Sequence, residues 1–194
     1  MQDFDGANSV DAATGLMSGA RQIPSANCDE RPPNARLSLV VLHGISLPPA
    51  SFSDDYVSQL FTNQLDANSH PYFREIAGLK VSSHLYIRRD GELIQFVPFT
   101  KRAWHAGDST YRGVSCCNDF SLGIEIEGTD DLPYTEIQYV VLAKVLRGLF
   151  AAYPALSARD LAGHCDIAPG RKTDPGPAFD WLRLYDSLVI PAAG

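Results

Sequence analysis

The segment from Ala162 to Pro175 (AGHCDIAPGRKTDP) concentrates side chains that can bind a metal ion or move a proton. Its titratable residues are His164, Asp166, Arg171, Lys172 and Asp174. Pro169-Gly170 between them predicts a turn, and loops that a scaffold holds at the surface commonly carry catalysis and binding. We therefore expect His164 and Asp174 to be two metal ligands, with Lys172 beside the metal.

A third ligand has to come from another part of the chain. Catalytic zinc sites use three protein ligands from His, Asp, Glu or Cys and leave a fourth position for water. His43 ends a strongly apolar run, which is where α/β sheets place functional groups. His43, His164 and Asp174 thus form a candidate zinc-hydrolase set. The spacing leaves a second interpretation open, in which both histidines are hydrogen-bonded near a core.

The stretch Ser121–Glu127 (SLGIEIE) alternates apolar and other residues, so Glu125 and Glu127 share one face of a strand. Glu125 is a candidate for proton transfer, whereas Glu127 is also consistent with a solvated or hydrogen-bonded carboxylate. Cys165 beside His164 suggests a thiol nucleophile. Adjacent strand residues point to opposite faces, so we do not expect this pair to act as a dyad.

The remaining patterns predict the elements that position these residues. Strands are expected at Arg36–His43, Ser82–Arg89, Glu92–Phe99, Ser121–Glu127 and Leu161–His164. Asp90-Gly91 between the second and third of them predicts a hairpin. Apolar residues at helical spacing predict helices at Asp54–Leu65, Thr135–Phe150 and Pro177–Leu188. Loops are expected at Asp66–Gly78 and Thr100–Val114.

Composition excludes several classes of protein. The chain has 194 residues, 45% of them hydrophobic, which suits one globular domain with its own core. Its net charge of −7, without a Lys/Arg-rich run, argues against nucleic-acid binding. No apolar run reaches the roughly 18 residues that span a bilayer, so we expect no membrane partner.

The N-terminal stretch and the cysteines suggest the compartment. Residues 1–20 are rich in Gly, Ala, Ser and Asp and read as a mobile tail before a domain at 21–190. This stretch lacks the basic and apolar regions of a signal peptide. The four cysteines form no CxxC pair and no disulfide framework. We therefore expect reduced thiols and a cytoplasmic location. We also expect a monomer.

Several long segments resemble the zinc-dependent N-acetylmuramoyl-L-alanine amidases related to peptidoglycan recognition proteins. The similarity is greatest to the 1,6-anhydro-N-acetylmuramyl-L-alanine amidases of bacterial cell-wall recycling, which are linked in relatives to control of β-lactamase induction. The matching segments are RQIPSANCDERP (21–32), LVVLHGISLPP (39–49), HPYFREIAGLKVSSHLYIRRDGELIQFVPFTKRAWHAG (70–107), CNDFSLGIEIEG (117–128) and GHCDIAPGRKTDPGPAFDW (163–181).

The resemblance implies a single α/β domain with a central mixed β-sheet flanked by helices. It implies one Zn²⁺ per chain, bound by His43, His164 and Asp174, with Glu125 and Lys172 catalytic. The zinc polarises the amide carbonyl and lowers the pKa of its water to about 7. Glu125 then takes the proton, and Lys172 stabilises the oxyanion. The implied substrate-binding residues are Tyr72, Lys80, Trp104, His105 and Asn118. The expected partners are anhydro-muropeptides or other peptidoglycan fragments.

Alternatives remain at this stage. Tyr72 is equally consistent with a core position, and His84 within its strand suggests a structural role. Gly44 and Cys116 stand where many relatives carry an asparagine and a basic residue, so fine specificity stays open. The chain could be a broad-specificity periplasmic amidase, which the absent signal peptide disfavours. It could also be a non-catalytic peptidoglycan-binding module, which the complete ligand set disfavours.

Overall fold

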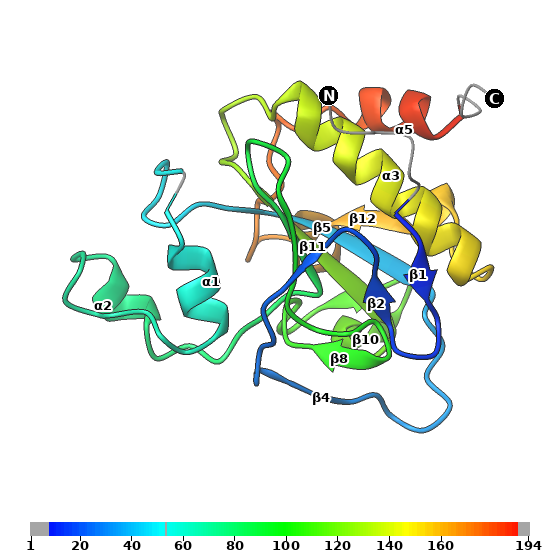
Figure 1. The fold of residues 1–194 in the computed structure, drawn as a ribbon, viewed down its shortest axis with the longest axis horizontal. Coiled ribbons are helices and arrows are strands. Elements are labelled where there is room, and N and C mark those ends of the chain that lie inside the picture. Colours follow the sequence, from blue (N-terminus) through cyan, green and yellow to red (C-terminus); the bar gives the residue numbers. More distant parts are fainter. Residues whose placement is uncertain (1–7, 53, 190–194) are drawn as a thin grey trace.

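The centre of the fold is a six-stranded mixed sheet with strand order β12-β5-β11-β6-β7-β3 (Figure 1). The computed structural model describes residues 8–52 and 54–189. The strands of this sheet are β3 (Arg21–Gln22), β5 (Leu39–Ile45), β6 (Leu85–Ile87), β7 (Leu93–Gln95), β11 (Ser121–Glu127) and β12 (Leu161–Gly163). Neighbours are parallel except the β6–β7 pair. The predicted α/β class with a mixed sheet is confirmed.

The two longest strands, β5 and β11, lie side by side at the centre. The alternating pattern predicts the observed bounds of β11. Its even positions, Leu122, Ile124 and Ile126, enter the main hydrophobic core with residues of helix α3. Its odd positions are also buried, so the face that carries Glu125 is covered by protein. Burying a carboxylate costs free energy unless another group compensates its charge, so this face of β11 is a candidate for the functional site.

Helices α3 (Glu136–Ala152) and α5 (Trp181–Val189) lie together over one face of the sheet (Figure 1). Thr135 caps α3 in a capping box: its hydroxyl accepts from Gln138 N, and the Gln138 side chain accepts from Thr135 N. Such a cap stabilises a helix by about 1 kcal/mol. Both helices were expected, although α5 begins later than Pro177.

Two short helices, α1 (Tyr56–Phe61) and α2 (Phe73–Ile76), lie at one end of the molecule (Figure 1). They form a second hydrophobic cluster with side chains of β6 and β7, including Tyr86 and Ile94. The helix expected at Asp54–Leu65 is shorter than predicted. The loop expected at Asp66–Gly78 contains α2, whose single turn is too short to show a helical period.

The hairpin predicted at Asp90-Gly91 is confirmed, with β6 and β7 antiparallel and Gly91 at φ 88°. A left-handed residue of this kind is what glycine tolerates best. The next segment differs from the predicted loop, because β8 (Lys101–Ala103) pairs with β4 (Cys28–Glu30). Two further short strands, β9 (Thr110–Tyr111) and β10 (Val114–Ser115), also pair there. Strands of two or three residues have too little length to show alternation.

Residues 8–20 do not form the unstructured tail that composition predicts. They contain a small hairpin of β1 (Val10–Asp11) and β2 (Leu16–Met17). Met17 is 3% exposed in the main core. The side chain of Gln95 accepts from Met17 N at 2.9 Å and donates to Gly15 O at 2.8 Å. This tether comes from a distant strand, so local sequence does not reveal it. Residues 1–7 lie outside the described residues.

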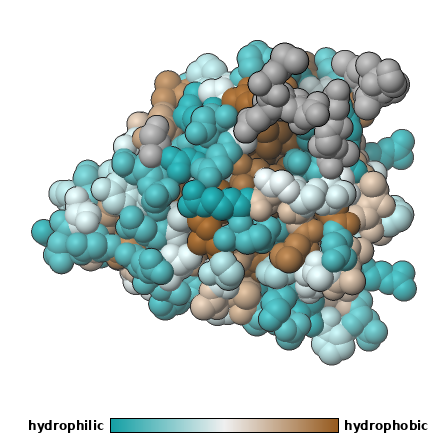
Figure 2. All heavy atoms as spheres, viewed as in Figure 1, coloured by the Kyte–Doolittle hydropathy of each residue, from teal (hydrophilic) through white to brown (hydrophobic). Residues whose placement is uncertain are grey.

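Hydrophilic side chains dominate the face shown in Figure 2, and its hydrophobic patches are small and separated by polar residues. Within residues 8–52 and 54–189, none of the helices has the length and apolar character that a membrane span requires.

Candidate metal and catalytic site

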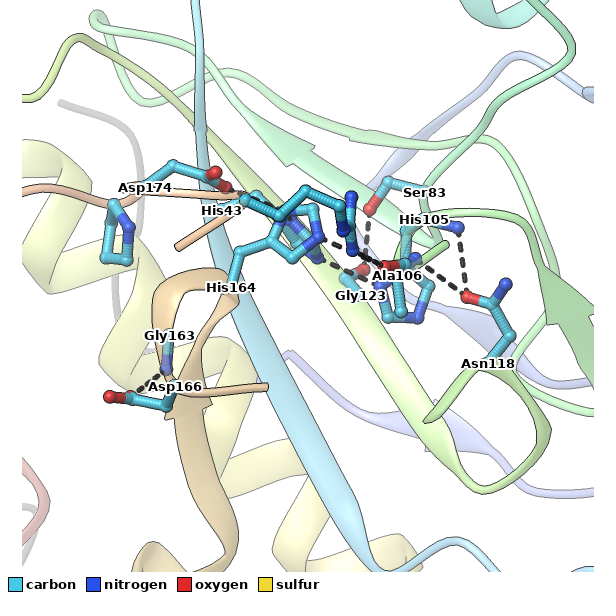
Figure 3. Close-up of polar contacts among 12 residues, drawn as sticks. His43, Ser83, His105, Ala106, Asn118, Gly123, Gly163, His164, Asp166 and Asp174 are labelled. Carbon is cyan, nitrogen blue, oxygen red and sulfur yellow. Dashed lines mark hydrogen bonds and ion pairs between the residues drawn. The ribbon is translucent and has the colours of Figure 1, made fainter. Parts of the chain in front are cut away.

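His43, His164 and Asp174 converge on one point beside the sheet (Figure 3). His43 Nδ1 lies 2.9 Å from His164 Nδ1 and 3.2 Å from Asp174 Oδ2, and His164 Nδ1 lies 3.1 Å from the same oxygen. Around a tetrahedral zinc with bonds of about 2.0 Å, ligand atoms lie roughly 3.3 Å apart. The triangle of two nitrogens and one oxygen therefore has the size of one face of a zinc tetrahedron.

Local structure explains how each ligand arrives there. His43 lies in β5, and β12 pairs with β5 in the register Gly163↔Leu42, so His164 follows directly opposite His43. The predicted strand ends at Gly163, and His164 begins the short helix α4 (His164–Ile167). Asp174 returns to the site after the turn that contains Gly170, at φ 76°.

Hydrogen bonds on the far side of each imidazole set its tautomer. His164 Nε2 lies 3.2 Å from Ala106 O, and a carbonyl can only accept, so Nε2 carries the hydrogen. His43 Nε2 lies 2.9 Å from His105 Nδ1, and His105 Nε2 lies 3.0 Å from Ser121 Oγ. With Nε2 of His43 as donor, both Nδ1 lone pairs face the triangle. Second partners of this kind orient metal-binding histidines in proteins.

The charge states also suit a metal. Burial lowers the pKa of His43 to about 4, against the opposing hydrogen bond with Asp174. Burial by itself raises the pKa of Asp174, but hydrogen bonds with His164 and His43 outweigh it, so this pKa lies well below its ordinary value. Near pH 7 His43 is neutral and Asp174 is ionised, which are the forms that coordinate metals.

Glu125 is the neighbour of His43 across the β11–β5 pair and shares its cleft. Its side chain is 8% exposed, and its Oε2 is buried without a hydrogen-bond partner in the described part of the chain. Burial raises the pKa of Glu125 well above its ordinary value, Asp174 raises it further, and Lys172 opposes the rise. A carboxyl group shifted in this way, in a cleft beside a metal site, is a candidate acid–base group.

The cleft has a volume of about 540 Å³. Its polar end holds the three candidate ligands with Glu125 and Lys172. Its apolar lining comes from α1, α2, the loops beside them and the residue after β8; it includes Leu47, Phe61, Tyr72, Ile76 and Trp104. A cleft of this size and mixed lining suits a ligand with both polar and apolar parts.

The structure separates the five predicted substrate-binding residues. Tyr72, Trp104 and His105 line the cleft. His105 is only 9% exposed, however, and both ring nitrogens already contact protein groups.

The other two predicted substrate-binding residues lie off the cleft. Lys80 Nζ donates to Asn63 Oδ1 at 3.0 Å, and Asn118 Oδ1 accepts from the backbone N–H groups of His105 and Ala106. Neither residue lines the cleft, because each side chain is turned to a protein partner.

His84, Glu127 and Cys165 have structural rather than catalytic surroundings. His84 is fully buried, and its Nδ1 accepts from Gly123 N at 3.0 Å, as a structural histidine does. Glu127 accepts from Arg89 N at 2.8 Å, so it is the hydrogen-bonded carboxylate of the two alternatives. Burial raises the pKa of Cys165, which is the opposite of an activated thiolate.

Tyr134 is a further residue beside the site, and no motif in the sequence indicated it. Its hydroxyl donates to Pro175 O at 2.9 Å, directly after Asp174, and its side chain is 5% exposed. A Cβ atom at Gly44 would lie 2.4 Å from Tyr134 Oη, and one at Gly128 would lie 2.4 Å from its ring. Gly44 and Gly128 are the sequence features that could have indicated Tyr134, since the absence of a side chain at each leaves room for its ring beside the site.

Comparisons with known proteins identify the family of the chain. Residues 33–177 match the Amidase_2 family model, described as N-acetylmuramoyl-L-alanine amidase. The chain belongs to this family. The amidase is 55% identical to the 1,6-anhydro-N-acetylmuramyl-L-alanine amidase AmpD of Citrobacter freundii, over 92% of this chain and 95% of that protein. The resemblance stated from the sequence motifs is therefore confirmed, and the chain is an enzyme of the amidase type.

Solved structures give the same result for the fold. The amidase superimposes on a crystal structure of selenomethionine AmpD with a TM-score of 0.88, at 54% identity, covering 90% of this chain and 97% of that one. A more distant match is Escherichia coli AmiD in complex with anhydro-N-acetylmuramic acid-L-Ala-D-γ-Glu-L-Lys. It has a TM-score of 0.58 and 28% identity, over 81% of this chain and 60% of that one.

Proposed function

We propose that this amidase is a zinc hydrolase of cytoplasmic peptidoglycan recycling. It cleaves the amide bond between 1,6-anhydro-N-acetylmuramic acid and L-alanine in muropeptides. The observation that carries the proposal is the His43, His164 and Asp174 triangle, which opens into the same cleft as Glu125 and Lys172. The names of the similar proteins, and the ligand in the AmiD complex, support this substrate class.

His43 Nδ1, His164 Nδ1 and Asp174 Oδ2 would hold one Zn²⁺ per chain. Two neutral imidazoles and one carboxylate are a usual donor set for catalytic zinc. When bound, the ion supplies Lewis acidity, which polarises an amide carbonyl and makes water easier to deprotonate.

Glu125 acts as the proton carrier. Its unpartnered Oε2 accepts the proton of the attacking water and later gives it to the nitrogen of the leaving L-alanine. Its raised pKa favours holding that proton between the two steps. Lys172 Nζ donates to the oxyanion of the tetrahedral intermediate, a contribution worth roughly 3 kcal/mol for comparable donors.

Tyr72 and Trp104 contact the muropeptide on the apolar wall of the cleft. All of these residues come from one chain, which supports activity as a monomer. The four cysteines are free thiols, which supports the reducing environment of the cytoplasm.

Mass spectrometry of reaction products tests the proposal. Purified enzyme with zinc is incubated with an anhydro-muropeptide and, separately, with insoluble sacculi. We expect free stem peptide and anhydro-N-acetylmuramic acid from the first substrate, little release from the second, and none after chelation. Comparable release from sacculi would favour the broad-specificity amidase. Binding of both substrates without release from either would instead show a peptidoglycan-binding module.

A further inference from the structure

The Nε2 atoms of the two candidate histidine ligands contact two consecutive residues, His105 and Ala106. His43 Nε2 contacts His105 Nδ1 at 2.9 Å, and His164 Nε2 contacts Ala106 O at 3.2 Å. Figure 3 shows both contacts on the side of the imidazoles away from Asp174. The segment His105–Ala106 therefore supplies the outer partner of each histidine. Its position controls which ring nitrogen carries the hydrogen, and so which one is free for a metal.

Asn118 holds this segment from one side. Its Oδ1 accepts from His105 N at 3.1 Å and from Ala106 N at 2.8 Å (Figure 3). One side-chain oxygen thus binds the N–H groups of both residues, next to the His105 ring and the Ala106 carbonyl that the two histidines contact.

Arg171 holds the same segment from the other side. It donates to Ala106 O at 2.7 Å and to Asp108 O at 2.6 Å. Ala106 O therefore accepts from both His164 and Arg171, which uses its two lone pairs. Neither Asn118 nor Arg171 lines the cleft. Both side chains contact only the backbone of residues 105–108 among the groups described above.

Strand β11 also contributes to the position of the His105 ring. Ser121 Oγ meets His105 Nε2 at 3.0 Å, and Gly123 leaves the space for the ring, because a Cβ there would lie 2.5 Å from His105 Cγ. Ser121, Gly123 and Glu125 occupy one face of the strand, so the strand that carries the proton carrier also supports His105.

We propose that Asn118 and Arg171 are positioning residues of the metal site, and that they hold His105–Ala106 so that His43 and His164 present Nδ1 to the ion. The proposal rests on the metal site of the proposed function. If the Ala106 carbonyl turned away, His164 Nε2 would lose its acceptor, and the competing tautomer would direct an N–H at the metal position. Outer partners of metal-binding histidines typically change metal affinity by about 10–100-fold.

Zinc affinity of the full-length protein, measured by competition with a chromogenic chelator, tests this role. We expect Asn118→Ala to weaken zinc binding by about 10–100-fold. Asn118→Asp keeps an acceptor oxygen at the same position and is expected to retain most of the affinity. Arg171→Gln, at an exposed side chain, is expected to weaken binding as well. The melting temperature of each zinc-free variant is measured in parallel.

Gln95→Ala is the matched control, because Gln95 is another side-chain amide that holds backbone groups, at Gly15 and Met17. We expect it to lower the melting temperature while leaving zinc affinity at the wild-type value. Unchanged zinc affinity in both Asn118→Ala and Arg171→Gln would overturn the proposal, whatever their melting temperatures. If Asn118→Ala fails to fold, Arg171→Gln decides.

Two further measurements separate the possible failures. Long-range ¹H–¹⁵N spectra of the imidazoles report the tautomers directly, and we expect a mixture in zinc-free Asn118→Ala where the wild type shows one form. A single unchanged tautomer would count against the positioning role. Absence of zinc binding by the wild-type protein would overturn the metal site itself, and with it this inference. Normal wild-type binding with unaffected variants would overturn the inference alone.

Discussion

His43 Nδ1 and His164 Nδ1 lie 2.9 Å apart although 121 residues separate them in the chain. The pairing of parallel strands β5 and β12 produces this contact, because Gly163 lies opposite Leu42 and the residue that follows each of them is a histidine. Polar residues at the carboxyl ends of neighbouring parallel strands commonly form sites in α/β proteins. The central sheet therefore brings together two of the three candidate ligands, and the loop that follows α4 supplies the third, Asp174.

Loss of one ligand should abolish metal binding. We expect His164→Ala to retain no zinc after dialysis and to release no stem peptide. The two remaining ligands would bind zinc too weakly to keep it from dissociating into the dialysis buffer. Cys165→Ala, one residue further on, is the matched control and should keep both zinc and turnover. Metal content by atomic absorption and product release by mass spectrometry check this. Full zinc content in His164→Ala would remove His164 from the ligand set.

Glu125→Gln should separate chemistry from metal binding. The amide cannot accept the proton of water, so we expect turnover to fall by about 10²–10⁴-fold while zinc content stays full. Glu127→Gln changes the next carboxylate on the same face, which bonds Arg89 N, and should affect stability more than turnover. Steady-state kinetics with metal analysis decide the matter. Zinc loss in Glu125→Gln would show that Glu125 is a ligand.

A side chain at position 44 should collide with Tyr134. Because the added Cβ would lie 2.4 Å from Tyr134 Oη, we expect Gly44→Ala to cost about 1–3 kcal/mol of unfolding free energy. Removing the hydroxyl in Gly44→Ala/Tyr134→Phe should recover part of that loss. Urea unfolding of both single variants and the double variant measures the coupling. Strictly additive effects would mean that the two residues do not meet.

His84 should make the protein sensitive to acid. Burial, and then the charge of Arg31, lowers its folded-state pKa to about 3 from 6.5. The unfolded chain therefore binds a proton below pH 6.5 that the folded protein does not take up until about pH 3. Stability is lost as pH falls through this window, by about 1.4 kcal/mol per pH unit for one proton.

Urea unfolding of wild type and His84→Gln at several pH values isolates this contribution. The variant is expected to be less stable near neutral pH, because it loses the bond to Gly123 N. Between about pH 6 and 4, the slope of its unfolding free energy against pH should be smaller than that of the wild type. The difference should correspond to one proton taken up on unfolding. If the unfolding free energies of the two proteins changed with pH in parallel, His84 would not be taking up a proton on unfolding.

Local patterns in the sequence predicted the main elements well. The bounds of β11, the hairpin at Gly91 and the start of α3 next to Thr135 each depend on a few neighbouring residues. Alternation, a left-handed glycine and a capping box are short-range effects, so the sequence expresses them directly. The elements that were missed, such as β8 and α2, are too short to show a period and form through contacts with distant segments.

For the site, the sequence by itself determined which groups are able to bind a metal, carry a proton or stabilise an oxyanion: His43, His164, Asp174, Glu125 and Lys172. Tertiary structure decided what the residues around them contact. His105 and Asn118 were expected to bind substrate, but the fold turns His105 toward His43 and Asn118 toward the backbone of residues 105 and 106. A hydrogen bond depends on where both partners lie in space. The partner of each side chain therefore emerges only when strands from separate parts of the chain are packed together.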